Sequence, residues 1–359
     1  MKILSTYYRL STAFGRANYS GLENCSQIWY TAFVSSTLTS LHSLPSSVLL
    51  RLDLDLPVLN GELDLSRLET GLLSLKHLLD KGVQHVRVIG HRGRPEGKKV
   101  RALSLKPVEA ALKARLSSEQ AKRVEVLENL RFDAREEAND PSLAKELAKG
   151  SGLFVNDAFA SSHREHTSIV GVPAILPSVI GLHFESELKH LHVAEQPNRP
   201  FIVLIGGAKI ETKLPLITRM CEKADVVLVG GKLIQELEHH ALAHRKLIRG
   251  KLDESGLDIS QDTVSQFERF FAMAKTIVWN GPMGKVEDGH LFGTQAMVTA
   301  LKKSNVPIII GGGDTEVYLD SELTSKSNVF VSSGGGAMLT YLSQGTVVGL
   351  EAIAKNPAN

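Results

Sequence analysis

The chain has 359 residues, 43% of them hydrophobic, and a formal net charge of +2. This length is enough for two domains that each bury a core, and the small net charge gives no electrostatic reason to expect nucleic acid or an anionic membrane as the main partner. Two cysteines, Cys25 and Cys221, are too few for a disulfide framework, and no apolar run reaches the ~18 residues of a membrane span, so we expect a cytoplasmic protein.

The first 46 residues differ in composition from the rest. They are rich in Ser, Thr and Tyr, and Glu23 is their sole acidic residue. An acid-poor, Ser-rich N-terminus is compatible with an organellar transit segment. A disordered tail or an over-extended reading frame explains the same composition, and we expect residues 1–46 to be such a tail.

Short apolar runs alternate with longer amphipathic ones from Ser47 onward. In the first half the runs are Val48–Val58, His85–Gly90, Val124–Glu128 and Leu153–Asp157. In the second half they are Phe201–Ile205, Asp225–Val229, Thr276–Trp279, Val306–Ile310 and Val329–Val331. Nearly continuous apolar runs are typical of strands buried on both faces of a parallel sheet.

Helical patterns fill the intervals between these runs. Leucines at helical spacing from Leu65 to Leu79 predict one helix, and Glu185–Glu195 predicts another that the prolines of Gln196–Pro200 end. The alternation predicts an α/β fold with two doubly wound parallel-sheet domains joined by a helix and a hinge. We place the first domain at residues 47–184, the helix and hinge at 185–199, and the second domain from residue 200.

Basic residues gather where the strands of the first half end. The carboxyl ends of parallel strands share one edge of a sheet, so we expect these side chains to form a pocket for a small polyanion. Its members are Arg67, His91, Arg94, Arg131 and Arg164. The alternating segment Arg51–Leu56 also fits a half-exposed strand. His163 and His166 have no evident third ligand for a metal.

Four strands of the second half run directly into glycine clusters. Glycine lets the backbone approach a ligand, and the N–H groups that open the next helix favour an anion. The clusters are Gly206–Lys209, Gly230–Lys232, Gly311–Thr315 and Gly334–Ala337. A single cluster of this kind is explained by tight turns alone. Four on one sheet favour a phosphate-rich ligand, although no P-loop and no dinucleotide fingerprint occurs.

Charged residues accompany these glycine clusters. Lys209 and Lys213 lie four residues apart near a helix start and either reach anionic oxygens or form a solvated face. Asp314 fits a Mg²⁺ ligand and a helix cap equally well. His240 and His244 have ligand spacing on a helix predicted over Glu238–Arg245, which we interpret as a solvated face.

Taken in order, these motifs resemble the phosphoglycerate kinase family. RLDLDLP is similar to the family's Arg-x-Asp-x-Asn-x-Pro strand and GHRGRP to its Ser-His-Leu-Gly-Arg-Pro turn, and ENLRF is unchanged. VNDAFASSHREHTS, GGAKIETK, IVWNGPMGKVE, GGGDT and SSGGGA continue the resemblance, which covers about Val48 to Ala354.

The resemblance implies reversible phosphoryl transfer from 1,3-bisphosphoglycerate to ADP, giving 3-phosphoglycerate and ATP in glycolysis. It implies that Asp53, Asp55, Arg67, His91, Arg94, Arg131 and Arg164 bind the glycerate. It implies that Lys209, Lys213, Asn280, Glu287, Gly312, Gly313, Asp314 and Thr315 bind ATP or ADP, with Asp314 on Mg²⁺. Arg67 and Lys213 are the implied catalytic residues. A monomer with a nucleotide-binding domain at 200–343 and a C-terminal tail at 344–359 that returns to the first domain is implied too.

The chain departs from the family pattern in both halves. Asp55 replaces an Asn, which adds a negative charge beside an anionic substrate unless Arg51 or another cation offsets it. Gly90 and Arg92 replace Ser and Leu. The segment between Gly231 and Leu257 is much shorter than usual, and Lys232, Lys285 and Ser260 replace small or apolar residues. These changes concern the pocket of the nucleotide base.

Two other functions fit parts of this pattern. The short second domain also suits a non-catalytic binding or regulatory protein on the same scaffold, although such a protein has no chemical need for Arg67, Lys213 and Asp314 together. The altered substrate strand suits a kinase that acts on another small carboxylate or acyl phosphate. Phosphoglycerate kinase activity remains the function that we predict.

Overall fold

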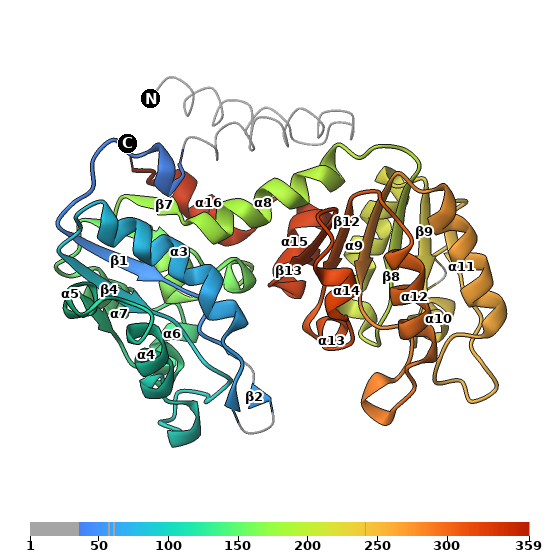
Figure 1. Cartoon of the computed structure of the whole chain (residues 1–359), viewed down its shortest axis with the longest axis horizontal. Helices are drawn as coiled ribbons and strands as arrows, with labels where there is room; N and C mark the ends of the chain where they lie inside the picture. Colours follow the sequence, from blue (N-terminus) through green and yellow to red (C-terminus); the bar gives the residue numbers. More distant parts are fainter. Residues whose placement is uncertain (1–35, 57, 60–61, 241, 359) are drawn as a thin grey trace. The chain divides into compact units, whose positions relative to one another are not determined.

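The computed structural model describes residues 36–56, 58–59, 62–240 and 242–358, and the chain from Ser36 onward forms one compact unit. This unit contains two α/β domains, each built on a parallel sheet, as the sequence predicted (Figure 1). Residues 1–35, most of the predicted tail, lie outside the described residues.

The first domain has a five-stranded parallel sheet in the order β5-β4-β1-β6-β7. Its strands are β1 (Ser47–Arg51), β4 (His85–Ile89), β5 (Val124–Val126), β6 (Leu153–Asn156) and β7 (Ser178–Ile180). Because the chain runs outward from β1 through β4 and β5 and then returns to β6, the strand order reverses between β1 and β6. In open α/β sheets ligands bind at such a reversal, beyond the carboxyl ends of the strands.

The second domain has a six-stranded parallel sheet in the order β10-β9-β8-β11-β12-β13. Its strands are β8 (Phe201–Ile205), β9 (Val226–Val229), β10 (Leu247–Arg249), β11 (Thr276–Asn280), β12 (Ile308–Gly311) and β13 (Val329–Ser332). Every residue of β8 is fully buried, which explains its unbroken apolar run. The strand order of this sheet reverses between β8 and β11.

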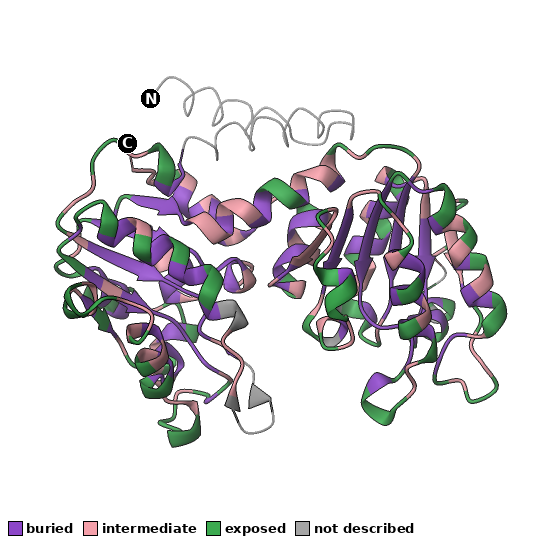
Figure 2. Ribbon diagram, viewed as in Figure 1, coloured by how far each residue is buried: buried purple, intermediate pink, exposed green. Residues whose placement is uncertain are grey.

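Helices cover both sheets, and their buried faces are turned toward the strands (Figure 2). Those of the first domain are α3 (Ser66–Asp80), α4 (Lys106–Lys113), α5 (Ser118–Lys122), α6 (Ala134–Glu137) and α7 (Pro141–Ala148). Next come α8 (Leu182–Glu195), α9 (Ile210–Lys223), α10 (Leu233–His239), α11 (Gln261–Met273), α12 (Phe292–Lys302), α13 (Gly313–Glu316), α14 (Ser321–Thr324), α15 (Gly335–Gln344) and α16 (Val348–Lys355). Short turns are η2 (Leu38–Ser40), η3 (Arg101–Leu103), η4 (Leu130–Phe132), η5 (Phe159–Ser161), η6 (Thr167–Gly171, a π-helix) and η7 (Val286–Asp288).

The first domain has a hydrophobic cluster on each face of its sheet. Val48 and Leu50 of β1 belong to the cluster that includes the leucines of α3, whereas Leu49 belongs to the cluster with Leu143 and Leu147 of α7. Successive residues of one strand thus serve opposite faces. Burying each such side chain stabilises the fold by about 1.5–3 kcal/mol.

The first predicted strand, Val48–Val58, is shorter than we expected. β1 ends at Arg51, and residues 52–56 form a loop in which the backbone N–H of Asp55 donates to Asp53 Oδ1 at 3.3 Å. Local hydrogen bonds from Asp side chains compete with the strand ladder. Val58–Leu59 (β2) pairs antiparallel with Glu62–Leu63 (β3) instead.

The helix predicted over Glu238–Arg245 is wrong. α10 ends at His239, and residues 242–244 are loop. The three-residue strand β10 then pairs in parallel with β9 at the edge of the sheet, starting at Leu247. His240 and His244 therefore do not share a helix face. The sequence analysis missed this strand and β7, which is equally short.

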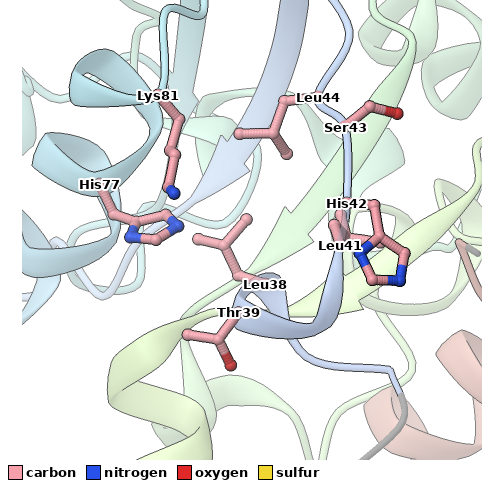
Figure 3. A pocket seen from close by; sticks show the side chains of 8 residues that line it. All are labelled: Leu38, Thr39, Leu41, His42, Ser43, Leu44, His77 and Lys81. Carbon is pink, nitrogen blue, oxygen red and sulfur yellow. The ribbon is translucent and has the colours of Figure 1, made fainter.

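Both ends of the described chain contact the first domain. Thr37 bridges to Ile180 of β7, and Leu38 is 1% exposed. Residues 38–39 and 41–44 line a pocket together with His77 and Lys81 of α3 (Figure 3). At the other end, Ser178 forms a parallel bridge to Pro357.

Candidate functional site

A buried arginine lies at the carboxyl end of β1. Arg51 is fully buried, and its Nε donates to Ser168 Oγ at 2.8 Å. The Ser168 hydroxyl donates in turn to Oε1 of the fully buried Glu136 at 2.5 Å. Burial lowers the pKa of the Arg51 guanidinium to about 10. Both terminal nitrogens of Arg51 are buried without a hydrogen-bond partner among the described residues, so this side chain is arranged to receive an anion.

Arg131 reaches the same area from the end of β5. It is 3% exposed, its Nη1 donates to the Gly93 carbonyl at 2.8 Å, and its Nε lies 3.4 Å from Glu137 Oε1. Its Nη2 is buried and has no partner in the described part of the chain. Burial, followed by the charge of Arg164, lowers its pKa. The Asn129 side chain, which caps η4, orients this turn by accepting from the Arg131 N–H at 3.1 Å.

Three histidines lie among these cations. Burial lowers the pKa of His91 well below 6.5, and the charges of Arg51, Arg131 and Arg164 lower it further. Burial is also the main cause that lowers the pKa of His163 and of His166 to about 4. Neutral imidazoles among arginines leave the positive charge of the site to the guanidinium groups.

The structure brings most of the predicted glycerate-binding residues together. Asp53 is 8% exposed and interacts with Arg51, while Arg164 is half-buried and adds its charge to that of Arg131. Arg94 is exposed, one residue beyond Gly93. Arg67 lies in the first turn of α3, and its side chain lies outside the described residues.

Sequence reasoning missed Arg51, Glu136 and Ser168 as members of this site. One signal was present, because a charged residue directly follows the apolar run Val48–Leu50. A charge at the end of a doubly buried strand is costly unless it is paired or bound to a ligand. The segment Arg51–Leu56 also fits a half-exposed strand, so only the packing identifies Arg51 as part of the site.

The glycine loops of the second domain meet where the order of its sheet reverses. The Gly207 N–H donates to the Pro282 carbonyl at 2.8 Å, which joins the ends of β8 and β11. Gly281 has φ +92°, and a Cβ added there would lie 2.3 Å from the Gly206 carbonyl oxygen. This position therefore requires glycine, because a side chain would be both strained and overlapping.

Polar side chains line the carboxyl ends of β11 and β12. Lys213 of α9 donates through Nζ to Oδ1 of Asn280, which is 1% exposed. The Thr315 hydroxyl oxygen accepts from the Gly281 N–H at 3.1 Å. A Cβ on Gly313 would meet nothing within 4 Å, so the backbone that opens α13 is accessible to a ligand.

The remaining predicted nucleotide residues lie around this centre. Gly312 precedes α13 with φ +110°, and Asp314 lies in α13 with its side chain outside the described set. Lys209 and Glu287 are exposed, the former directly before α9 and the latter in η7.

Lys232 and Lys285, which replace small or apolar residues of the family pattern, both lie on the surface. Lys232 Nζ is 3.4 Å from Glu236 Oε1, and Lys285 Nζ is 2.6 Å from Asp288 Oδ2. Each lysine thus has a carboxylate neighbour of its own.

Comparison with known proteins gives a consistent result. The family model described as phosphoglycerate kinase matches residues 39–246 and 237–345. A phosphoglycerate kinase from Borrelia garinii is 33% identical, over 86% of this chain and 96% of that protein. One from Finegoldia magna is 30% identical, over 88% and 98%. A solved phosphoglycerate kinase structure from Coxiella burnetii has a TM-score of 0.73 at 26% identity, covering 90% of this chain and 99% of that chain.

The comparisons also locate a difference in length. The span aligned with the Borrelia garinii relative is 377 residues, which exceeds the 359 residues of this chain. The family match divides at residues 237–246, where α10 ends and β10 is about to begin. Within the described residues, no helix combines the length and apolarity that crossing a membrane requires.

Proposed function

The chain belongs to the phosphoglycerate kinase family and shares its activity, and from this premise we propose how its two domains divide the reaction. The transfer runs reversibly between the acyl phosphate of 1,3-bisphosphoglycerate and ADP, so a carboxyl group is the acceptor in the reverse direction. We propose a cytoplasmic monomer with domains at residues 47–184 and 200–343, a helix and hinge at 185–199, and a tail at 344–359.

The first domain binds the glycerate in this proposal. The observation that carries it is the pair of buried guanidinium groups, Arg51 and Arg131: both terminal nitrogens of Arg51 and the Nη2 of Arg131 have no hydrogen-bond partner among the described residues. Arginine forks match phosphate and carboxylate oxygens in geometry as well as charge. The residues assigned to this binding are Asp53, Asp55, Arg67, His91, Arg94, Arg131 and Arg164.

The second domain binds the nucleotide. Backbone N–H groups at the start of α13 and the Lys213 ammonium are suited to phosphate oxygens, since both present donors at the reversal of strand order. The residues assigned to ATP or ADP are Lys209, Lys213, Asn280, Glu287, Gly312, Gly313, Asp314 and Thr315.

A magnesium ion fits this donor set as a companion of the phosphates. Among the described residues no three His, Cys, Asp or Glu side chains gather to hold a metal. Mg²⁺ in kinases is commonly bound by one or two carboxylates together with substrate phosphates. Asp314 would be its protein ligand, and the ion would neutralise charge on the phosphates.

The protein's contribution to the chemistry is positioning and charge. The attacking oxygen is already an anion in either direction, so no general base is required. Arg67 and Lys213 are the proposed catalytic residues because a cation close to the transferring group stabilises charge in the transition state. Closure of the two domains about the hinge would exclude water and suppress hydrolysis.

The test is formation of ATP from enzymatically generated 1,3-bisphosphoglycerate and ADP with Mg²⁺, with GDP in parallel. Lys213→Ala should abolish most turnover, whereas Lys122→Ala, which removes a lysine with a 70% exposed side chain from α5, should leave it unchanged. A folded protein that binds 3-phosphoglycerate without turnover with any nucleotide would contradict the proposal. If the enzyme turned over a different acyl phosphate but not 1,3-bisphosphoglycerate, the carboxylate that we propose as its substrate would be wrong.

A further inference from the structure

Asp55 is the substitution that most directly alters the glycerate side of the site. One of its oxygens, Oδ1, accepts from the backbone N–H of Gly93 at 2.8 Å. The other, Oδ2, lies 3.7 Å from His91 Nε2. His91 and Arg131 are the basic neighbours of this added carboxylate, whereas the Arg51 guanidinium interacts with Asp53 and Glu136.

His91 is held between this carboxylate and the arginines. It is 6% exposed, and its Nδ1 is buried with no hydrogen-bond partner in the part of the chain that the structure describes. The cations that act on it come from three elements: Arg51 ends β1, Arg131 lies in η4, and Arg164 follows η5. His166 adds to them and lies 3.9 Å from the buried Glu136.

The surroundings of His91 keep this imidazole neutral. Burial and the surrounding guanidinium groups hold the pKa of His91 well below its usual range. A neutral imidazole carries one N–H, so it cannot donate from both nitrogens at once. A polyanion bound among the arginines offsets their charge and offers an acceptor for the second nitrogen.

We propose that Asp55 and His91 form a proton-linked pair, in which binding of the anionic glycerate is accompanied by uptake of one proton from water onto the His91 ring. This inference rests on the proposed function of the first domain. The proton comes from solvent, no other bond is made or broken, and the imidazolium then donates to Asp55 through Nε2 and to the ligand through Nδ1. Asp55 is thereby a specificity-determining residue, because the imidazolium that adds to the charge of Arg131 beside Asp55 forms only when the site holds a ligand anionic enough to protonate His91.

Two properties of ligand binding follow. Where a full proton is taken up, affinity for the glycerate falls by about tenfold for each unit of rising pH. An Asn at position 55 would keep the acceptor for the Gly93 N–H but would remove the partner of the imidazolium. Asp55→Asn should therefore fold normally and bind the ligand with little dependence on pH.

The experiment is calorimetric titration of 3-phosphoglycerate into the full chain at pH 7.5, in two buffers of different ionisation enthalpy. At this pH the phosphate of the ligand is mostly dianionic, because its second pKa is about 6. We expect the wild type to take up more than about half a proton and Asp55→Asn less than half of the wild-type value. His91→Gln should lose the uptake as well.

Glu137→Gln is the matched control. Glu137 Oε1 lies 3.4 Å from Arg131 Nε, so this variant also removes one negative charge beside the arginines but leaves His91 and Asp55 intact. It should keep the wild-type uptake. Binding with no proton uptake in the wild type, or equal uptake in Asp55→Asn, would overturn the proton-linked pair and leave the proposed function standing. No binding at all by the wild type would overturn both.

Discussion

The two domains differ in the groups that we propose for binding phosphate. The first domain has buried charge, since Arg51 and Arg131 are desolvated, and both terminal nitrogens of Arg51 and the Nη2 of Arg131 have no partner among the described residues. The second domain has glycine loops at its strand ends, where the backbone at Gly313 is open, and its lysines Lys209 and Lys232 are exposed. Buried charge is costly to assemble and attracts an anion electrostatically, whereas backbone donors are neutral. This difference predicts which substitutions and conditions should weaken each domain most.

The largest effect should come from breaking the charge network of the first domain. Arg51→Ala leaves the fully buried Glu136 with Ser168 but without the charge of Arg51, which reaches Glu136 through the Ser168 hydroxyl. Removing one of two interacting buried charges typically costs about 3–5 kcal/mol. We expect a fall of this size in the free energy of unfolding, measured by urea denaturation.

Arg115→Ala provides the comparison for this loss. Arg115 pairs with Glu69 on the surface, where the side chains are 28% and 56% exposed. Exposed pairs contribute little because water solvates both partners. A loss of stability in Arg51→Ala no larger than that in Arg115→Ala would show that the buried network is not what holds the first domain together.

The second largest effect is a pH dependence of stability that comes from two buried acids, Asp157 and Glu187, at helix α8. Burial raises the pKa of Asp157, which accepts from the Phe184 N–H of α8, to about 7. Burial likewise raises the pKa of Glu187 of α8, which accepts from Ser333, to about 7. A folded-state pKa above the unfolded one stabilises the fold at low pH, and that stability is lost as pH rises through about 7. We expect stability to fall by on the order of 2 kcal/mol per group between pH 5 and 7.

The check is urea denaturation at several pH values. Asp157→Asn keeps the acceptor for Phe184 and should flatten the fall in stability between pH 5 and 7, as should Glu187→Gln. Asp140→Asn removes an exposed helix-capping carboxylate whose pKa is lowered, so the fall should persist in that variant. An unchanged slope in both Asp157→Asn and Glu187→Gln would contradict the assignment.

Two glycine replacements in the second domain should separate backbone strain from overlap between neighbouring loops. Gly281→Ala forces an L-residue to φ +92° and places its Cβ 2.3 Å from the Gly206 carbonyl oxygen. Gly207→Ala has a similar φ of +97°, but its Cβ would meet nothing within 4 Å. The strain alone costs about 1–2 kcal/mol.

Steady-state kinetics with ADP separate the two glycine variants. We expect Gly281→Ala to lose about tenfold more kcat/KM for ADP than Gly207→Ala, since a further 1.4 kcal/mol from the overlap corresponds to that factor. Equal losses would mean that strain alone, and not the contact between the two loops, determines the shape of the donor site.

The sequence predicted the fold well and the site in part, for reasons visible in particular residues. Continuous apolar runs such as Phe201–Ile205 identify buried strands because burial on both faces leaves no room for polar residues. Strands β7 and β10 were missed because three residues show little pattern, although β5, equally short, was found within the predicted run Val124–Glu128. The role of Arg51 was not readable, because its partner Ser168 lies 117 residues away and only the packing brings them together.

Ionic strength should give the smallest effect and the most direct test of the comparison. Salt screens charge–charge attraction, with a Debye length of about 10 Å at 0.1 M, and acts weakly on neutral N–H donors. In the proposed arrangement charged side chains bind the glycerate, so we expect its KM to rise a few-fold between 20 and 200 mM KCl, roughly in proportion to the screening. The KM for Mg-ADP should rise less, because Mg²⁺ neutralises part of the phosphate charge and the glycine loops contribute uncharged donors.

Steady-state kinetics at constant free Mg²⁺ measure both values. Equal salt dependence for the two substrates would mean that both domains rely on charge to the same extent, and the contrast between buried guanidinium groups and backbone donors would no longer describe how this enzyme binds phosphate.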